Sequence, residues 1–429
     1  MHMRKLAVLL LALVLVATAC SNASNTENQQ NGDTGNSEAG QTTVTWWVPN
    51  WDEAVAKELI AKFEAANPGV KVEIVTMTWD TMENQIRVSL MSKEAPDVIT
   101  ELESRVKNLA SQNLLMNLDG FYDEHLDKDD FIASALEINT YEGSIYGVPF
   151  RHDGSGVLYN KTMFEEAGLD PDHFPETWDE FVTAMELLTK DTNGDGTIDQ
   201  YALAWPLGNQ ANAVTRFIQL LYSEGGDILN EDGTRSALNS PEAVEALEKL
   251  VATIKNGYAP TSTMELDNTT LRGLFVNERI AAYIGGQFDI APIQEENPNI
   301  QLGTAVIPGP NGMGTSTVNG FSLIVPEQAR QKEAAMELVK FIAEPEHMAE
   351  LTATFPGTRS ALEHEKFADP LLKPFADQLE QGKSEPSYAN WPAMEKAIFE
   401  IIQAVVLTDS PIEDAVKMMS EAVDNIISQ

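Results

Sequence analysis

Oxygen-bearing side chains recur at alternate positions in one short segment, at the spacing that wraps a hard cation. The run Asp191 to Asp199 matches positions one, three, five, six and nine of an EF-hand calcium loop, and Gly196 permits its sharp turn. Position twelve is Ala202, so the usual bidentate glutamate is missing. The candidate metal ligands are Asp191, Asn193, Asp195, Thr197 and Asp199. The spacing predicts a structural Ca²⁺ ion, and a turn without metal is the alternative.

The rest of the chain carries no motif typical of a catalytic site. It has no Gly-x-Ser-x-Gly, His-Glu-x-x-His or P-loop sequence, and its six histidines show no ligand spacing. The 66 acidic residues always include carboxylate pairs of the kind that hydrolyse glycosidic bonds, so such pairs carry little information. We therefore predict that the protein is not an enzyme and uses no organic cofactor. A secreted carbohydrate-active hydrolase is the alternative.

The N-terminus has the layout of a secretory signal. Arg4 and Lys5 precede the apolar run Leu6 to Ala17, which is too short for a membrane span of about 20 residues. The run ends in Ala17-Thr-Ala-Cys20, and Cys20 is the only cysteine, so it cannot form an internal disulfide. The pattern resembles a bacterial lipoprotein lipobox, although leucine is usual where Ala17 stands. It predicts removal of residues 1–19 and acylation of Cys20, with an ordinary signal peptide as the alternative.

Composition separates a tether from a folded body. Residues 20–42 contain almost nothing apolar, which predicts a flexible linker, and no later stretch approaches 18 apolar residues. The formal net charge of −38 becomes −40 when Arg4 and Lys5 leave with the signal. Such a surface repels nucleic acid and anionic lipid, and so excludes both as partners. We expect an extracytoplasmic protein anchored to the cell membrane through Cys20.

Strands and helices alternate in the folded body. Thr43 to Val48 and Val70 to Ile74 predict strands, and Asp52 to Ala66 places its apolar residues on one helical face between them. This β-α-β order predicts an α/β fold whose mostly parallel sheet carries helices on both faces.

Several helix starts are marked by their capping residues. Thr177 and Glu180 form a capping box, and Ser240-Pro241 is an N-cap followed by proline at the first helical position. Ser410-Pro411 predicts the same arrangement for the last helix.

Short motifs follow one another over the whole chain. They are Thr43-Val-Thr-Trp-Trp-Val48, Phe63-Glu-Ala-Ala-Asn-Pro-Gly-Val-Lys-Val-Glu-Ile74, Ala95-Pro-Asp-Val-Ile99, Tyr146-Gly-Val-Pro149, Gly156-Val-Leu-Tyr-Asn-Lys161, Pro175-Glu-Thr-Trp-Asp-Glu-Phe181 and Phe275-Val-Asn-Glu-Arg-Ile-Ala-Ala-Tyr-Ile-Gly-Gly286. Together they resemble the family 1 extracellular solute-binding proteins, the maltose-binding-protein-like group. Any one of these motifs is weak evidence for the family, whereas all of them in this order are specific to it.

The resemblance implies a two-lobed, periplasmic-binding-protein-like (type II) fold with a hinge and a ligand cleft between the lobes. We place crossovers near Arg151–Asp153, Val318–Gly320 and Asp369–Phe375. Lobe 1 then comprises residues 43–152 and 319–372, and lobe 2 comprises residues 153–318 and 373–429.

Candidate ligand-binding residues combine aromatic rings, on which the C–H faces of a sugar stack, with polar groups that pair with its hydroxyls. Trp51 follows the first strand and Glu101 follows another, at the edge where open sheets bind ligands. By resemblance, Asp153 stands where maltose-binding proteins carry a ligand-binding carboxylate, and Phe288 stands where many relatives have tryptophan. The full set is Trp51, Glu101, Arg105, Asp153, Trp205, Gln287, Phe288, Asn319, Arg359 and Trp391.

Structural roles are open alternatives for several of these residues. Core packing is the alternative for Trp205 and Trp391, absence of ligand contact is the alternative for Trp51, and a surface salt bridge is the alternative for Arg105. For Asn319 and Arg359, a crossover turn and a loop donor are equally good interpretations. Trp178 is assigned to packing, Trp79 is ambiguous, and at least one of Trp46 and Trp47 must be core because they alternate on a strand.

The function that the resemblance implies is capture of a carbohydrate and its delivery to an ABC transporter permease by lobe closure. An oligosaccharide is favoured because the candidate aromatic residues are numerous and dispersed. The partners are then the carbohydrate and the permease subunits, and the protein is expected to be a monomer. A sugar-sensing lipoprotein that takes no part in transport is an alternative.

Overall fold

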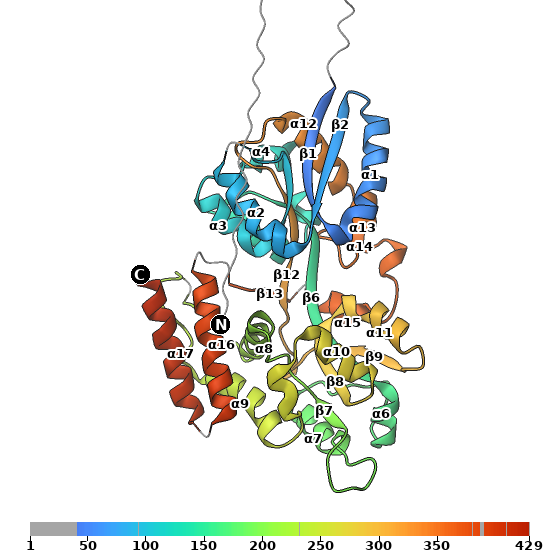
Figure 1. The fold of residues 1–429 in the computed structure, drawn as a ribbon, viewed down its shortest axis with the longest axis vertical. Helices are drawn as coiled ribbons and strands as arrows, with labels where there is room; N and C mark the ends of the chain where they lie inside the picture. Colours follow the sequence, from blue (N-terminus) through green and yellow to red (C-terminus); the bar gives the residue numbers. More distant parts are fainter. Residues whose placement is uncertain are drawn as a thin grey trace, which may run out of the picture. The chain divides into compact units, whose positions relative to one another are not determined.

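The computed structural model describes residues 41–92, 94–230, 232–379, 381–386, 390–408 and 410–428. The predicted signal peptide, Cys20 and the predicted linker up to residue 40 lie outside the described residues. No described helix is both long and apolar enough to cross a membrane. The described body has the α/β fold that the sequence predicts, with helices around a sheet (Figure 1). The sheet is mixed rather than mostly parallel as predicted, because β6 (Val148–Asn160) and β12 (Thr317–Ile324) pair antiparallel with each other and with other strands.

The first lobe begins with alternating strands and helices. β1 (Thr42–Pro49) pairs in parallel with β2 (Val70–Met77) and with β3 (Val98–Leu102). Between them run α1 (Glu53–Ala66) and α2 (Trp79–Met91), each of which buries one apolar face. The carboxyl ends of these parallel strands therefore meet at one edge of the sheet.

Two long strands are shared between the lobes. The first part of β6 (Val148–Asn160) pairs antiparallel with β12 (Thr317–Ile324), and from Ser155 onward β6 pairs with β8 (Ile280–Gly286) and β9 (Leu302–Ala305). The strand order is β2-β1-β3-β12-β6-β8-β7, with β13 beside β12 and β9 beside β6. Because β6 and β12 reach both lobes, they form the hinge, while the lobe boundaries given above stay predictions.

The remaining elements are further helices of the two lobes, the sheet strands β7 and β13, and two separate pairs of short strands, β4 with β5 and β10 with β11 (Figure 1). They are α3 (Glu103–Ser111), α4 (Asp119–His125), α5 (Ala133–Ile138), β4 (Thr140–Tyr141), β5 (Ser144–Ile145), α6 (Lys161–Glu166), α7 (Trp178–Leu188), β7 (Tyr201–Leu203), α8 (Gln210–Ser223), α9 (Pro241–Lys255), α10 (Asn268–Val276), α11 (Ile290–Glu296), β10 (Pro308–Gly309), β11 (Gly312–Met313), α12 (Lys332–Ala343), α13 (Pro345–Leu351), α14 (Arg359–Leu362), α15 (Lys373–Leu379), β13 (Lys383–Ser384), α16 (Trp391–Leu407) and α17 (Ile412–Ile427).

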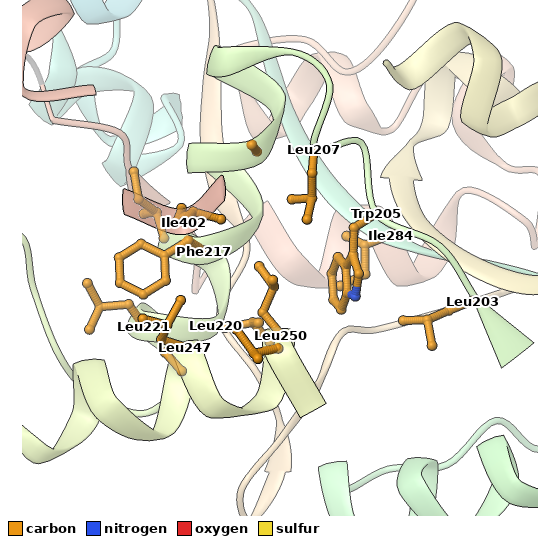
Figure 2. Packing of buried hydrophobic residues seen from close by; sticks show 14 of the residues in the cluster. Leu203, Trp205, Leu207, Phe217, Leu220, Leu221, Leu247, Leu250, Ile284 and Ile402 are labelled. Carbon is orange, nitrogen blue, oxygen red and sulfur yellow. The ribbon is translucent and has the colours of Figure 1, made fainter. Parts of the chain in front are cut away.

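Each lobe has a hydrophobic core of its own. In lobe 1 the core includes Trp46, whose Nε1 donates a hydrogen bond to Thr100 Oγ1 at 3.2 Å. The core of lobe 2 includes Trp205, which Figure 2 shows beside Ile284 of β8, while Phe217 of α8, Leu247 of α9 and Ile402 of α16 gather in another part of the same cluster. These two cores hold the strand ends that carry the polar and aromatic residues described next.

Candidate functional site

Three aromatic rings gather at the sheet edge where β1 and β2 end. Trp51 lies just after β1, Trp79 begins α2 just after β2, and Phe321 lies on β12. The ring centroids are 6.3 Å apart for Trp51 and Trp79, 6.1 Å for Trp51 and Phe321, and 5.3 Å for Trp79 and Phe321. Trp51 is 49% exposed, and the other two rings are partly buried. We call this set the aromatic platform.

Charged groups flank the aromatic platform on the side of α3. The guanidinium of Arg105 lies 5.6 Å from the centre of the Trp79 ring and forms an ion pair with Glu83. A second carboxylate, Glu101, is 3.9 Å from Arg105 and accepts a hydrogen bond from the backbone N–H of Leu102 at 2.8 Å. Burial raises the pKa of Glu101 to about 7, although Arg105 opposes the shift. The structure thus brings Glu101 and Arg105 together, and Arg105 forms the salt bridge given above as the alternative to ligand contact, beside the partly buried Trp79 ring. Its role in binding stays a prediction.

The hinge carries a polar cluster at the point where the two lobes meet. Asp153 on β6 accepts a hydrogen bond at 2.8 Å from Nε2 of Gln287, which follows β8. Asn319 lies opposite Asp153 on β12, and its Oδ1 accepts the backbone N–H of Gly320 at 2.9 Å. Phe288, next to Gln287, is 52% exposed. Burial raises the pKa of Asp153, with Arg151 as the main opposing charge.

Two buried side-chain contacts support the strand ends behind the platform. Arg151 Nη2 donates to Asp52 Oδ1 at 2.7 Å, and the same guanidinium lies 5.5 Å from the Phe321 ring. His152 Nδ1 and Glu103 Oε2 are 2.8 Å apart, and both side chains are fully buried. Burial raises the pKa of Asp52 and of Glu103. Sequence reasoning missed these pairs and Phe321, because residues far apart in sequence meet only in the folded sheet.

The structure corrects the prediction that Trp205 contacts the ligand. Its side chain is 1% exposed in the core of lobe 2, and its Nε1 donates a hydrogen bond to Thr253 Oγ1 at 2.7 Å. Figure 2 shows the ring among the buried aliphatic side chains of that core. With both faces packed, the ring offers no surface on which a sugar could stack, so the prediction of ligand contact for Trp205 is wrong.

Arg359 and Trp391 also lie apart from the platform residues. Arg359 Nη1 donates to the backbone oxygens of Asp129 at 2.9 Å and of Phe131 at 2.8 Å, so it ties α14 to the loop before α5. This agrees with the loop-donor interpretation rather than ligand contact. Trp391 begins α16 and packs partly buried against the core of lobe 2. Its role in binding stays a prediction.

The carboxylates of the predicted calcium loop face its own backbone. Asp191 accepts hydrogen bonds from the N–H groups of Gly194 and Gly196, both at 2.7 Å, and these bonds lower its pKa. Asp199 accepts from the N–H of Thr192 at 2.9 Å. Among the described residues, no group of three or more acidic, histidine or cysteine side chains is arranged to hold a metal ion. The bonds fit the turn alternative, and calcium stays a prediction.

Two lobes joined by shared strands, with polar groups and an aromatic platform at their junction, are the design of a solute-binding protein. A family model described as "Bacterial extracellular solute-binding protein" matches residues 49–349. The chain belongs to this family.

Relatives and solved structures agree with this assignment. The sequence is 25% identical over 393 residues to "Maltotriose-binding protein" of Pyrococcus abyssi, covering 86% of this chain and 80% of that protein. It is 27% identical over 316 residues to "Uncharacterized lipoprotein in oleD 5'region" of Streptomyces antibioticus, covering 71% and 66%. The fold resembles that of the sugar-binding protein MalE from Xanthomonas citri, with a TM-score of 0.80 at 24% identity, covering 90% of this chain and 98% of that one. The predicted two-lobed fold is confirmed.

Proposed function

We propose that this protein captures a carbohydrate, and specifically an oligosaccharide, outside the cell and delivers it to an ABC transporter permease by lobe closure. The observation that carries the proposal is the half-exposed Trp51 ring, held against Trp79 and Phe321 beside Glu101 and Arg105. Such a surface matches both faces of a sugar, since rings stack on C–H groups and charged groups bond hydroxyls. The maltotriose specificity in the name of the Pyrococcus abyssi relative supports the same ligand class.

The state of the carboxylates supports capture rather than cleavage. Asp52 is held by Arg151, Glu103 contacts His152, and Glu83 is paired with Arg105. Glycoside hydrolysis needs one carboxylate to deliver a proton and another to attack or to activate water across an open space. Carboxylates that bond neighbouring side chains of the protein are poorly placed for either role.

Anchoring and partners complete the proposal. Acylation of Cys20 would hold the protein at the outer face of the cell membrane, and one relative is itself named a lipoprotein. Permease subunits would receive the ligand from the closed form, with the protein acting as a monomer. Adjacent permease genes would support import, whereas an adjacent sensor kinase gene alone would favour the alternative of a sugar-sensing lipoprotein.

A binding screen tests the proposal. Neutral oligosaccharides of two to four residues should raise the melting temperature, because a ligand that binds only the native state stabilises it. For each hit, small-angle scattering should show a smaller radius with bound sugar, because the ligand favours the closed state. If no oligosaccharide raises the melting temperature, the carbohydrate proposal fails. A hit without a change in radius would overturn lobe closure alone.

A further inference from the structure

A buried arginine in lobe 2 has hydrogen-bonding capacity that the protein does not use. Arg216 on α8 is 4% exposed, and its Nη1 donates to Gln219 Oε1 at 3.0 Å. Gln219 in turn donates from Nε2 to Thr317 Oγ1 on the hinge strand β12 at 2.8 Å, which fixes Arg216 beside the hinge. Its buried Nε has no hydrogen-bond partner among the described residues. Burial of an N–H without a hydrogen-bond partner costs free energy. A ligand oxygen that accepted a hydrogen bond from this N–H would remove that cost, so the ligand would bind more tightly.

Nearby carboxylates do not neutralise this guanidinium by direct contact. Asp289 and Glu385 are its closest negative charges, yet Asp289 accepts from Arg272 Nη1 at 3.0 Å and from the Tyr283 hydroxyl at 3.0 Å. Glu385 accepts from Thr215 Oγ1 at 2.5 Å. Among the described residues, no ion pair is formed by Arg216 within 4.0 Å. A donor and an acceptor thus lie near each other without bonding each other.

Glu385, which bonds the side chain of Thr215 next to Arg216 in the chain, borders an open space between the lobes. Glu385 lines a cavity of about 230 Å³, whose walls also include Lys107 of α3, Glu137 of α5 and Tyr222 of α8. The first two belong to lobe 1, and Tyr222 belongs to lobe 2 on the same helix as Arg216. A molecule held between the lobes therefore reaches Glu385 without unfolding either lobe.

We infer that Arg216 and Glu385 form a specificity site that binds neighbouring hydroxyl groups of a neutral sugar residue, the guanidinium donating and the carboxylate accepting. The inference rests on the proposed carbohydrate function and adds a lobe 2 contact to the aromatic platform of lobe 1. A vicinal diol matches a donor beside an acceptor, since each hydroxyl both gives and takes a hydrogen bond.

Surrounding charge determines which ligands the site rejects. Glu395 is a further carboxylate close enough to affect Glu385, so a uronate or phosphate bound to Arg216 would lie among Asp289, Glu385 and Glu395. Each of these groups repels an anion when ionised, whereas a neutral hydroxyl is not repelled. We therefore expect the site to select neutral sugars over acidic sugars of equal length.

The test pairs Arg216→Met with a matched control, Arg272→Met. Arg272 is the partly buried arginine that pairs with Asp289 and Glu296, a structural role. Calorimetry with maltotriose, other neutral oligosaccharides of two to four residues and trigalacturonate would measure affinity, and melting curves without ligand would measure stability. We expect Arg216→Met to weaken neutral-sugar binding at least tenfold while its ligand-free melting temperature stays equal or rises. Arg272→Met should lower the melting temperature.

Each other outcome has one meaning. Neutral-sugar affinity within twofold of wild type in Arg216→Met, or a lowered melting temperature with affinity retained, would make Arg216 structural and overturn the inference while the proposed function stands. Trigalacturonate binding more tightly than every neutral sugar would overturn the selectivity for neutral ligands. If no sugar of the panel binds the wild type, the proposed function and this inference fall together.

Discussion

Glu101 gives the sharpest test of the electrostatics at the candidate site. It is 1% exposed at the end of β3, and burial raises its pKa from 4.5 to about 7. The positive charge of Arg105 opposes this rise in pKa, and the negative charge of Glu83 adds to it. Replacement by glutamine keeps the shape and the hydrogen bond to Leu102 but removes the titration. The difference in unfolding free energy between Glu101→Gln and the wild type therefore measures how much ionisation of this buried carboxyl destabilises the folded protein.

The sign follows from proton binding. Between pH 4.5 and 7 the folded protein keeps the Glu101 proton while the unfolded chain releases it, so the stability of the wild type falls as the pH rises through this window. The interval is 2.5 pH units, which at about 1.4 kcal/mol per unit corresponds to a loss on the order of 3 kcal/mol. Glutamine has no such loss. The variant should match the wild type near pH 4.5 and exceed it by up to about 3 kcal/mol at pH 8.

Urea unfolding of both proteins at pH 4.5, 6 and 8 measures this difference directly. Glu83→Gln is the comparison variant, because it removes a charge that raises the pKa of Glu101 but keeps the Glu101 carboxyl, so its gain in stability at pH 8 should be smaller than that of Glu101→Gln. The reasoning is refuted if the stability difference between Glu101→Gln and the wild type stays constant, or shrinks, as the pH rises.

Further predictions concern the rings, the loop and the anchor. Trp51→Ala should weaken sugar binding roughly tenfold with an unchanged melting curve, since stacking contributes about 1 kcal/mol or more; unchanged affinity by calorimetry would remove the ring from the site. Trp205→Ala should destabilise the fold by roughly 3–5 kcal/mol in urea unfolding, because it empties a core position, and a loss below about 1 kcal/mol would contradict that role. Chelator should lower the melting temperature and added calcium restore it if residues 191–199 hold Ca²⁺, whereas an unmoved curve favours the plain turn. Cys20→Ala should move the protein from the membrane fraction to the medium, and retention in the membrane would exclude lipid anchoring.

Helix starts were predictable where local chemistry decides them. The capping box of Thr177 and Glu180 is present, with Glu180 N–H bonded to Thr177 Oγ1 at 3.3 Å, and Ser240 caps α9 with Pro241 at its first position. The last helix departs by one residue, since Pro411 and not Ser410 is its N-cap. Ser410 Oγ instead bonds Thr408 Oγ1 at 2.9 Å. The Thr408 hydroxyl therefore takes the hydrogen bond of Ser410, and the Ser-Pro capping pattern does not include a residue at that position.

Site residues were predictable where position along a strand decides exposure. Trp51 follows β1 at the carboxyl edge of the sheet, and it is half-exposed there. Trp205 stands on an equally apolar segment after β7, but it is buried in the core of lobe 2, where its Nε1 bonds Thr253 of α9. Sequence shows that a ring follows a strand, whereas its exposure depends on helices that arrive from distant parts of the chain. Phe321 was not predicted as a site residue, because an apolar residue within a strand is normally expected to belong to the core.

The hinge strands β6 and β12 carry three of the candidate groups, Asp153, Asn319 and Phe321. These strands approach so closely at Gly320 that a Cβ placed there would lie 2.0 Å from the backbone oxygen of Arg151. Their pairing also shifts register between Phe321 and Ser322, next to the ring that completes the aromatic platform. Asp153, two residues beyond Arg151, accepts the hydrogen bond from Gln287 of lobe 2. Because these strands themselves carry the platform ring Phe321 and the hinge carboxylate Asp153, we expect a change in hinge angle to move these candidate ligand contacts with it, which would couple binding to lobe closure.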